Sequence, residues 1–169
     1  MFDLSGKKAL VTGATGGLGS EIARALHKAG ASVALSGTRE AVLNELASEL
    51  GDRVAVCPAN LSDADSVDAL PKQASEALDG LDILISNAGV TRDQLLMRMK
   101  DEEWETVIKV NLEAHYRRSK AAMRRMLKQR FGRIIGITPL PAVTGIAGQT
   151  NLAASHPASI VFTQALSPG

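Results

Sequence analysis

The sequence predicts an α/β fold in which a doubly wound parallel sheet lies between two layers of helices. Short runs rich in Val, Ile, Leu and Ala alternate with helical patterns, which is the order of βαβ units. Aromatic residues make up only 3% of the chain, so the core must be aliphatic, as suits helices packed closely on a parallel sheet. Because βαβ crossovers are right-handed, helices are expected on both faces of the sheet.

Each element has its own local signal. Strands are expected where β-branched and aliphatic residues gather, at 8–12, 32–36, 53–59, 81–86 and 133–137. Helices are expected between them at 17–29, closed by Gly30, and at 39–50, stopped by Gly51. A third helix begins at an N-cap on Ser62, bends at Pro71 and runs toward Leu78. Asp101 is expected to cap a long helix over 101–129, and a last helix follows Gly148.

Length and composition exclude several classes of protein. The chain has 169 residues, which is about one domain, and 45% of them are hydrophobic and 22% charged, as in globular proteins. A net charge of +1 gives no field for nucleic acid or membrane, so neither partner is expected. The single cysteine, Cys57, excludes an internal disulfide. With no signal-peptide layout and no apolar run near about 20 residues, we expect a cytoplasmic protein.

The charges are unevenly distributed. Residues 134–169 contain no Asp, Glu, Lys or Arg, so His156 is their only titratable side chain. Four of the six prolines also lie there, and the sequence changes character near Thr138. A basic stretch comes just before, formed by Arg117, Arg118, Lys120, Arg124, Arg125, Lys128, Arg130 and Arg133. The simpler reading of this stretch is a solvated helix face, and the alternative is a docking patch for an acidic partner.

A glycine-rich turn follows the first strand. The spacing G-x3-G-x-G places Gly13, Gly17 and Gly19 before a helix whose free N–H groups can bind a phosphate. This spacing differs from the commonest dinucleotide motif, G-x-G-x-x-G, and a tight turn without a ligand is the alternative. Its place between a first strand and a helix favours a nucleotide site, so we predict one dinucleotide-binding domain over 1–169.

The end of the second strand predicts the choice of cofactor. Sites for NAD usually carry an acidic residue here, which accepts the ribose 2′-hydroxyl. This chain reads Ser36-Gly37-Thr38-Arg39 and has no acid before Glu40. Thr38 and Arg39 suit a 2′-phosphate, so NADP(H) is predicted; the alternative is that Arg39 only opens a solvated helix.

Further motifs carry a family resemblance. Asn87-Ala88-Gly89, together with TGATGGLG at 12–19, resembles the short-chain dehydrogenase/reductase family. The stretches 87–104 and 110–112 resemble the bacterial 3-oxoacyl-(acyl-carrier-protein) reductases. The match is continuous over 2–138 and degraded over 139–166, and family members continue with further strands. The resemblance implies a Rossmann-like fold that is incomplete at its C-terminal end.

The resemblance also assigns a cofactor site and one catalytic residue. The cofactor residues are Gly13, Thr15, Gly17, Leu18, Gly19, Thr38, Arg39, Asn60, Leu61, Asn87, Ala88 and Gly89. Among them the motif glycines would hold the pyrophosphate, Thr38 would lie near the 2′-phosphate, and Asn60 and Leu61 would flank the adenine. Asn111 matches the family's catalytic asparagine, which maintains a water relay. Alone, Asn111 would read as a polar residue inside a helix, bonded to nearby backbone. No metal site is expected.

The rest of the family's catalytic set is missing. The family uses a serine after the fifth strand and a Tyr-x-x-x-Lys on the next helix, and these positions align with Pro139, Leu152 and His156. Pro and Leu side chains can neither donate nor accept a hydrogen bond. The only tyrosine, Tyr116, lies on the long helix and is not expected to substitute, and Thr138 is one position away. Very low activity is therefore expected.

Three functions remain open at this point. The resemblance implies NADPH-dependent reduction of 3-oxoacyl-(acyl-carrier-protein) in fatty-acid synthesis, with Arg130 and Arg133 docking the acyl carrier protein. The alternatives are a non-catalytic NADP-binding module and an inactive, truncated or altered copy. A homo-oligomer is expected in each case, because the strand at 133–137 would leave an open edge.

Overall fold

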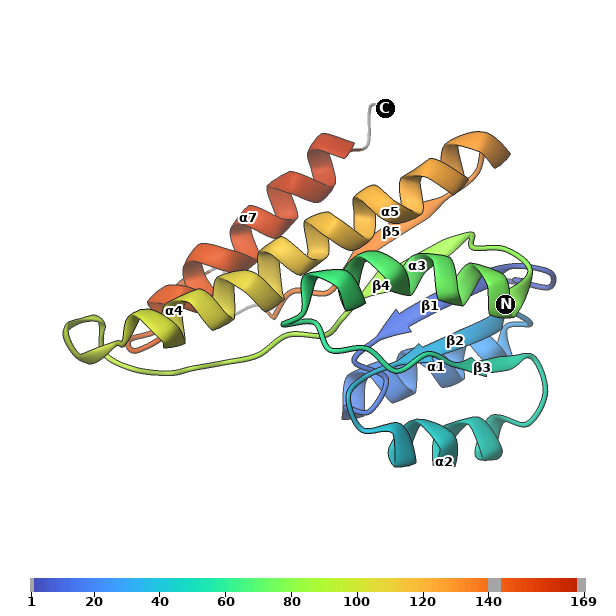
Figure 1. Ribbon diagram of the computed structural model, residues 1–169, viewed down its shortest axis with the longest axis horizontal. Coiled ribbons are helices and arrows are strands. Elements are labelled where there is room, and N and C mark those ends of the chain that lie inside the picture. Colours follow the sequence, from blue (N-terminus) through green and yellow to red (C-terminus); the bar gives the residue numbers. More distant parts are fainter. Residues whose placement is uncertain (1, 140–143, 167–169) are drawn as a thin grey trace.

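A parallel sheet lies at the centre of the molecule. The computed structural model describes residues 2–139 and 144–166. Its five strands have the order β3-β2-β1-β4-β5 (Figure 1). Their bounds are Lys8–Thr12 for β1, Ser32–Ser36 for β2, Val54–Val56 for β3, Ile83–Ser86 for β4 and Arg133–Gly136 for β5. Every pairing is parallel, and the winding reverses between β1 and β4. The expected doubly wound fold is confirmed.

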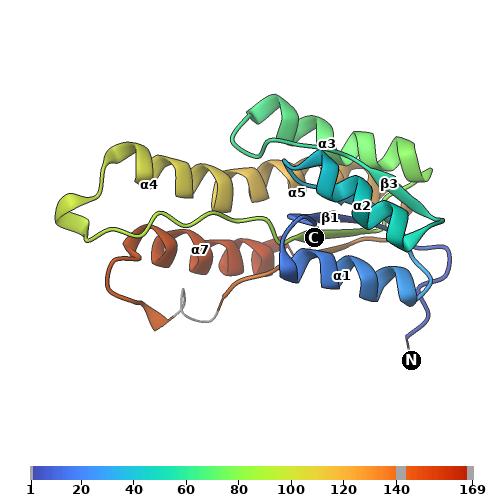
Figure 2. The same cartoon turned by 90° about the horizontal axis from the view of Figure 1, so that it is seen from below.

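Helices cover both faces of the sheet. Helices α1 (Gly17–Lys28) and α2 (Glu40–Leu50) lie on one face, and α3 (Ala64–Leu78) and α5 (Ala114–Gln129) on the other (Figure 2). Alternate residues of one strand serve the two layers. Ala9 and Val11 pack with α1 and α2, whereas Leu10 packs with α3 and α5. This double burial explains why the strands read as continuous apolar runs.

The helices α4 and α5 continue past the carboxyl ends of the strands (Figure 1). Helix α4 (Asp101–Ile108) passes through a π-helical turn, η2 (Lys109–Glu113), directly into α5. A 3-10 turn, η1 (Leu96–Arg98), precedes α4, and α7 (Thr150–Leu166) packs beside α4 and β5. The expectation of one unbroken α-helix over 101–129 was wrong at η2. Single π turns are frequent at functional sites, and this one contains Asn111.

Other expected boundaries also differ from the structure, most by one or two residues. The N-cap of α3 is Asp63, whose carboxylate accepts from Ser66 N at 3.0 Å; Ser62 is held outside by a bond from its N–H to Asn60 Oδ1. Helix α4 has Lys100 at its N-cap, with its N–H bonded to Glu103 Oε2 at 2.9 Å. Strand β3 stops at Val56, although irregular backbone bonds to β2 continue to residue 59.

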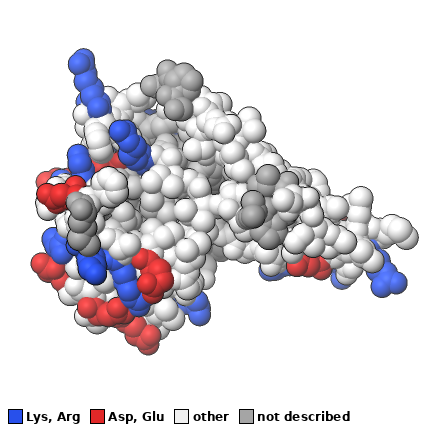
Figure 3. Space-filling model, turned by 180° about the vertical axis from the view of Figure 1, so that it is seen from behind, with Lys and Arg blue, Asp and Glu red and all other residues white. Residues whose placement is uncertain are grey.

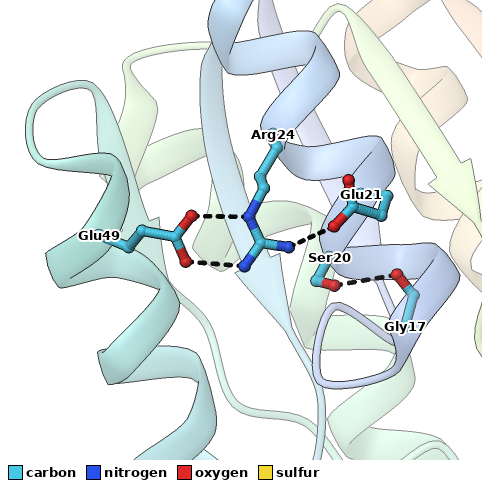
Figure 4. Close-up of polar contacts among 5 residues, drawn as sticks. All are labelled: Gly17, Ser20, Glu21, Arg24 and Glu49. Carbon is cyan, nitrogen blue, oxygen red and sulfur yellow. Dashed lines mark hydrogen bonds and ion pairs between the residues drawn. The ribbon is translucent and has the colours of Figure 1, made fainter.

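One exposed ion pair joins the first two helices (Figure 4). Arg24 on α1 donates through Nε and Nη2 to the two carboxylate oxygens of Glu49 on α2, both at 2.7 Å. Its Nη1 donates to Glu21 at 2.7 Å on its own helix. The hydrogen bonds from Arg24 to Glu49 hold the pKa of the Glu49 carboxyl below its ordinary value. Because the group is exposed, salt is expected to weaken the pair.

The surface reflects the uneven charge of the sequence. Seen from behind, the middle of the molecule shows no Lys, Arg, Asp or Glu, and charges flank it on both sides (Figure 3).

Among the residues that the structure describes, no helix is long and apolar enough to cross a bilayer.

Candidate functional site

The candidate site begins where the sheet changes direction, at the carboxyl ends of β1 and β4. Thr12, the last residue of β1, is fully buried and donates from Oγ1 to Ile85 O at 3.1 Å. The same oxygen accepts from the backbone N–H of Asn87 at 3.1 Å and of Ala88 at 3.3 Å. Ligands of open α/β sheets bind at such a switch point. No role was predicted for Thr12 from the sequence, although its position at the end of a strand was an available signal.

The glycine-rich turn needs glycine for close approach. Gly13 has a φ of +68°, and a Cβ there would lie 2.9 Å from Ala88 Cα. A Cβ on Gly19 would collide with the carbonyl oxygen of Gly13, so α1 passes tightly over the turn. At Gly17 a Cβ would meet nothing within 4 Å, which leaves open space at the N-terminus of α1. The turn therefore presents backbone to a cleft without side chains in the way.

A cleft of about 320 Å³ lies over this turn. It brings together nine of the predicted cofactor residues, namely Gly13, Thr15, Thr38, Arg39, Asn60, Leu61, Asn87, Ala88 and Gly89. The remaining three, Gly17, Leu18 and Gly19, do not line it, and Leu18 is exposed on the first turn of α1. Val90 and Val110 also line the cleft and were not predicted from the sequence. The π turn η2 places Val110 in the cleft, and nothing in the local sequence pattern indicates that position.

The lining of the cleft also includes a cation. Arg39 Nη2 donates to the backbone oxygen of Thr15, so the guanidinium lies against the first turn. A Cβ on Gly37 would lie 2.9 Å from Thr15 Cγ2, which shows how closely the two loops approach. Among the described residues that line this cleft there is no Asp or Glu. The electrostatics beside Arg39 therefore favour an anion.

Asn111 connects η2 to the loop after β4. Its side chain accepts from Val90 N at 2.9 Å and donates to Val90 O at 3.0 Å. Its own backbone oxygen accepts from Ser159 Oγ of α7 at 3.3 Å. The side chain is thus bonded to backbone, as expected if Asn111 is a polar residue inside a helix with a structural role. Its predicted catalytic role stays a prediction.

The three positions aligned with the missing catalytic residues lie in different surroundings. Pro139 is exposed, whereas Leu152 is 4% exposed and packs against Val107 and Val90. His156 is buried and lines a second cavity beside Asn111. Burial lowers the pKa of His156, so the imidazole is neutral near pH 7. Neither Pro139 nor Leu152 offers a proton to a substrate.

Tyr116 lies away from both cavities. It is 44% exposed on α5, and its hydroxyl accepts from Lys120 Nζ at 3.3 Å. Tyr116 lines neither the cleft nor the second cavity in the part of the chain that the structure describes. Its place gives no support to a substitute role in proton donation.

The two arginines predicted to dock a carrier protein lie on one surface. Arg130 ends α5 in a left-handed conformation with φ 54°, and Arg133 begins β5. Both are exposed, and both line a broad groove of about 1060 Å³ with Leu127 and Phe131. The guanidinium of Arg133 lies 5.2 Å from the centre of the Phe131 ring. The groove is therefore partly apolar with cations at its side.

Comparisons with known proteins agree with this architecture. The family model described as short chain dehydrogenase matches residues 7–168. Nodulation protein G of Rhizobium sp. (strain N33) is 52% identical over 166 residues, covering 98% of this chain and 68% of that protein. The 3-oxoacyl-(acyl-carrier-protein) reductase FabG of Vibrio harveyi is 43% identical over 165 residues, with the same coverage of 98% and 68%.

A solved structure gives the same result. A protein of Sinorhizobium meliloti 1021 assigned to the short-chain alcohol dehydrogenases superposes with a TM-score of 0.92 at 34% identity, covering 98% of this chain and 67% of that one. The chain thus spans about two thirds of the length of these relatives. Members of this group are oxidoreductases that use nicotinamide cofactors. With its sheet order, glycine-rich turn and cleft at the switch point, this chain belongs to the short-chain dehydrogenase family.

Proposed function

We propose that this chain binds NADP(H) as a single dinucleotide-binding domain and is related in function to the 3-oxoacyl-(acyl-carrier-protein) reductases, with very low reductase activity. The observation that carries the proposal is the cleft at the switch point, whose lining includes both the glycine turn and Arg39, with Arg39 bonded to Thr15 O. The pyrophosphate would lie over Gly13 and the open N-terminus of α1. Asn60 and Leu61 would flank the adenine.

The choice of NADP(H) over NAD(H) rests on charge. Arg39 is exposed, and the bond that it makes is to a backbone oxygen, so its guanidinium can turn to a 2′-phosphate at little cost. Thr38 can add a hydroxyl. No carboxylate from the described residues lines the cleft to accept a 2′-hydroxyl or to repel a phosphate. The expected preference follows from charge-assisted hydrogen bonds, which are stronger than neutral ones.

The low activity follows from the residues on the substrate side. Reduction of a ketone needs a proton donor near the oxygen as hydride arrives, and general acid catalysis contributes about 10²- to 10⁴-fold in rate. Bound NADPH would supply the hydride. Of the chain's own residues, Asn111 would order the loop at Val90, whereas Leu152 fills an apolar contact and His156 is neutral. Substrate would be held without being protonated efficiently.

Binding and turnover should be measured on the same sample. Calorimetry with NADPH and with NADH tests the cleft, and NADPH oxidation with a 3-oxoacyl-(acyl-carrier-protein) substrate tests the chemistry. We expect NADPH binding with a turnover far below the roughly 10 per second typical of enzymes. If the protein binds neither NADPH nor NADH, the proposal is overturned. Binding together with ordinary turnover would support full reductase function and refute the assignment of Pro139, Leu152 and His156.

The acyl carrier protein is proposed as the partner on the surface of Arg130 and Arg133. An acidic carrier would pair with these exposed cations, and the groove beside them offers Leu127 and Phe131 for apolar contact. The double variant Arg130→Glu/Arg133→Glu should abolish binding to the carrier. Arg98→Glu, which reverses an exposed charge on η1, is the matched control. Equal binding by all three proteins would refute this surface. A cytoplasmic setting is proposed with it.

A further inference from the structure

The basic stretch contains one residue that is not on a solvated face. Arg118 on α5 is 1% exposed, and its Nε and Nη1 atoms have no hydrogen-bond partner among the described residues. The adjacent Arg117 behaves differently, since it donates to Glu113 and Asp68 on the surface. The reading of the whole stretch as a solvated face was therefore wrong at Arg118. Buried charges are normally paired, so an unpaired buried guanidinium indicates a missing anion.

Arg118 faces a cavity in which no described residue is acidic. The cavity has a volume of about 180 Å³ and lies between the carboxyl ends of β4 and β5 and helices α5 and α7. Its lining includes Ser86, His115, Thr138 and His156 beside Arg118, and no described residue in the lining is Asp or Glu. Ser86 Oγ and His115 Nδ1 are also buried without partners. The cavity thus offers a cation and hydroxyl groups with no anion among them.

The protonation states of these groups match an anion site. Burial lowers the pKa of Arg118 to about 10, which leaves the guanidinium charged near pH 7. Burial and then the charge of Arg118 lower the pKa of His115 to about 4, so this imidazole is neutral. Thr163 Oγ1 donates to Ser159 O at 2.8 Å and therefore accepts from His115 Nε2 at 3.0 Å. His115 Nδ1 is then left as a free lone pair that can take a proton once Arg118 is neutralised.

We propose that this cavity binds a small carboxylate through the guanidinium of Arg118. A planar guanidinium matches a carboxylate in shape and charge, and the hydroxyl of Ser86 can add a donor. The cavity adjoins the nucleotide cleft, because Ala88 lines both. The carboxylate site does not depend on NADP(H), so it goes beyond the function proposed above. The phosphates of a dinucleotide are the other source of an anion, and the experiment separates the two.

Acetate is the probe for the first experiment. It is titrated into nucleotide-free protein by calorimetry, at constant ionic strength set with chloride, and inorganic phosphate is titrated in parallel. We expect saturable binding of acetate, weakened roughly tenfold to a hundredfold in Arg118→Leu, as for loss of a charged hydrogen bond. Arg125→Leu removes the same charge from an exposed site of the same helix and should bind acetate like the wild type. Titration of acetate in the presence of saturating NADPH shows whether the carboxylate site and the nucleotide cleft are separate. Binding of NADPH by each variant shows whether that variant is folded.

The proposal fails if acetate does not saturate, if only phosphate binds, or if Arg118→Leu binds acetate as tightly as wild type. Competition in which NADPH abolishes acetate binding would overturn it in favour of a cofactor phosphate at Arg118. Loss of NADPH binding alone, with acetate binding intact, would refute the proposed function and leave the carboxylate site standing.

A second measurement uses the unmodified chain and does not depend on how a variant folds. Burial and then the charge of Arg118 lower the pKa of His115, and a carboxylate bound at Arg118 would offset the second of these, so acetate should move the NMR titration of His115 to higher pH. Equal titration of His115 with acetate and with chloride overturns the proposal.

Discussion

Thr12 and Asn87 fasten the carboxyl ends of β1 and β4 to each other. Asn87 donates to Thr12 twice: its backbone N–H to Oγ1 at 3.1 Å, and its side-chain Nδ2 to the backbone oxygen at 3.2 Å. The same amide lies 3.4 Å from Gly13 O, so one side chain connects both strands to the glycine-rich turn. The floor of the nucleotide cleft is therefore held by hydrogen bonds between two strands that are far apart in sequence.

Replacing Thr12 should weaken both the fold and nucleotide binding. In Thr12→Val the part-buried N–H groups of Asn87 and Ala88 and the buried oxygen of Ile85 lose their common partner. Leaving such groups unpaired costs about 1–3 kcal/mol. Urea unfolding should show that loss, and NADPH calorimetry should show weaker binding. Thr12→Ser keeps the hydroxyl and is the control; unchanged stability in Thr12→Val would contradict the role assigned here.

Arg39 should set the preference between the two dinucleotides. Arg39→Ala removes the one cation that lines the described cleft, and one charged contact to phosphate is worth about 1.5–3 kcal/mol. NADPH affinity should fall about tenfold or more, whereas NADH affinity should hardly change. Arg24→Ala, on α1 and outside the cleft, is the control. If wild type binds NADPH and NADH equally well in calorimetry, the assignment of Arg39 is wrong.

Activity should return only when the three aligned positions are changed together. The variant Pro139→Ser/Leu152→Tyr/His156→Lys should oxidise NADPH with a 3-oxoacyl substrate far faster than any single variant, because such residues act as a unit. Its stability should fall, since Tyr at the buried position 152 overpacks the contact with Val107 by about 1–3 kcal/mol.

A matched triple variant with Leu152→Phe in place of Leu152→Tyr isolates the phenolic hydroxyl. This protein carries nearly the same volume into the core but has no proton donor, so it should stay inactive. Equal activity of the two triple variants would show that the proton comes from elsewhere.

The structure makes stability depend on pH through His115. Its pKa falls from the ordinary 6.5 to about 4 because it is buried and lies near Arg118, so the unfolded chain binds the proton more tightly. Stability is full above about pH 6.5 and is lost as pH falls toward 4, by about 3 kcal/mol in total. His156 shifts in the same direction. The free energy of unfolding, measured with urea at several pH values in this window, should depend less steeply on pH in His115→Phe than in wild type. An equally steep dependence on pH would contradict the assignment.

The fold was more predictable from sequence than the cavities. Strands β1 and β2 end where predicted, because glycine-rich turns stop an apolar run sharply. The π turn was missed, since its bonds between Asn111 and Val90 are tertiary. The spacing of residues along α5 was an available signal for the burial of Arg118, because positions 115, 118, 122 and 126 form one face of this helix. The cavity beside it depends on how α5 and α7 meet, which no local pattern encodes.

The last prediction concerns association through β5. Among the described residues β5 pairs only with β4, and Ile135 on this edge is 44% exposed. An open edge with an apolar side chain is a template for pairing with another chain, and the adjacent groove adds exposed Leu127. Light scattering should therefore show a mass above that of the monomer, rising with protein concentration. Ile135→Lys places a charge on the edge, as natural edge strands do, and should lower the mass. Phe2→Lys changes a residue that is 92% exposed at the other end of the chain and should leave the association intact. A wild-type chain that stays monomeric at high concentration, or equal masses for both variants, would show that β5 is not the associating edge.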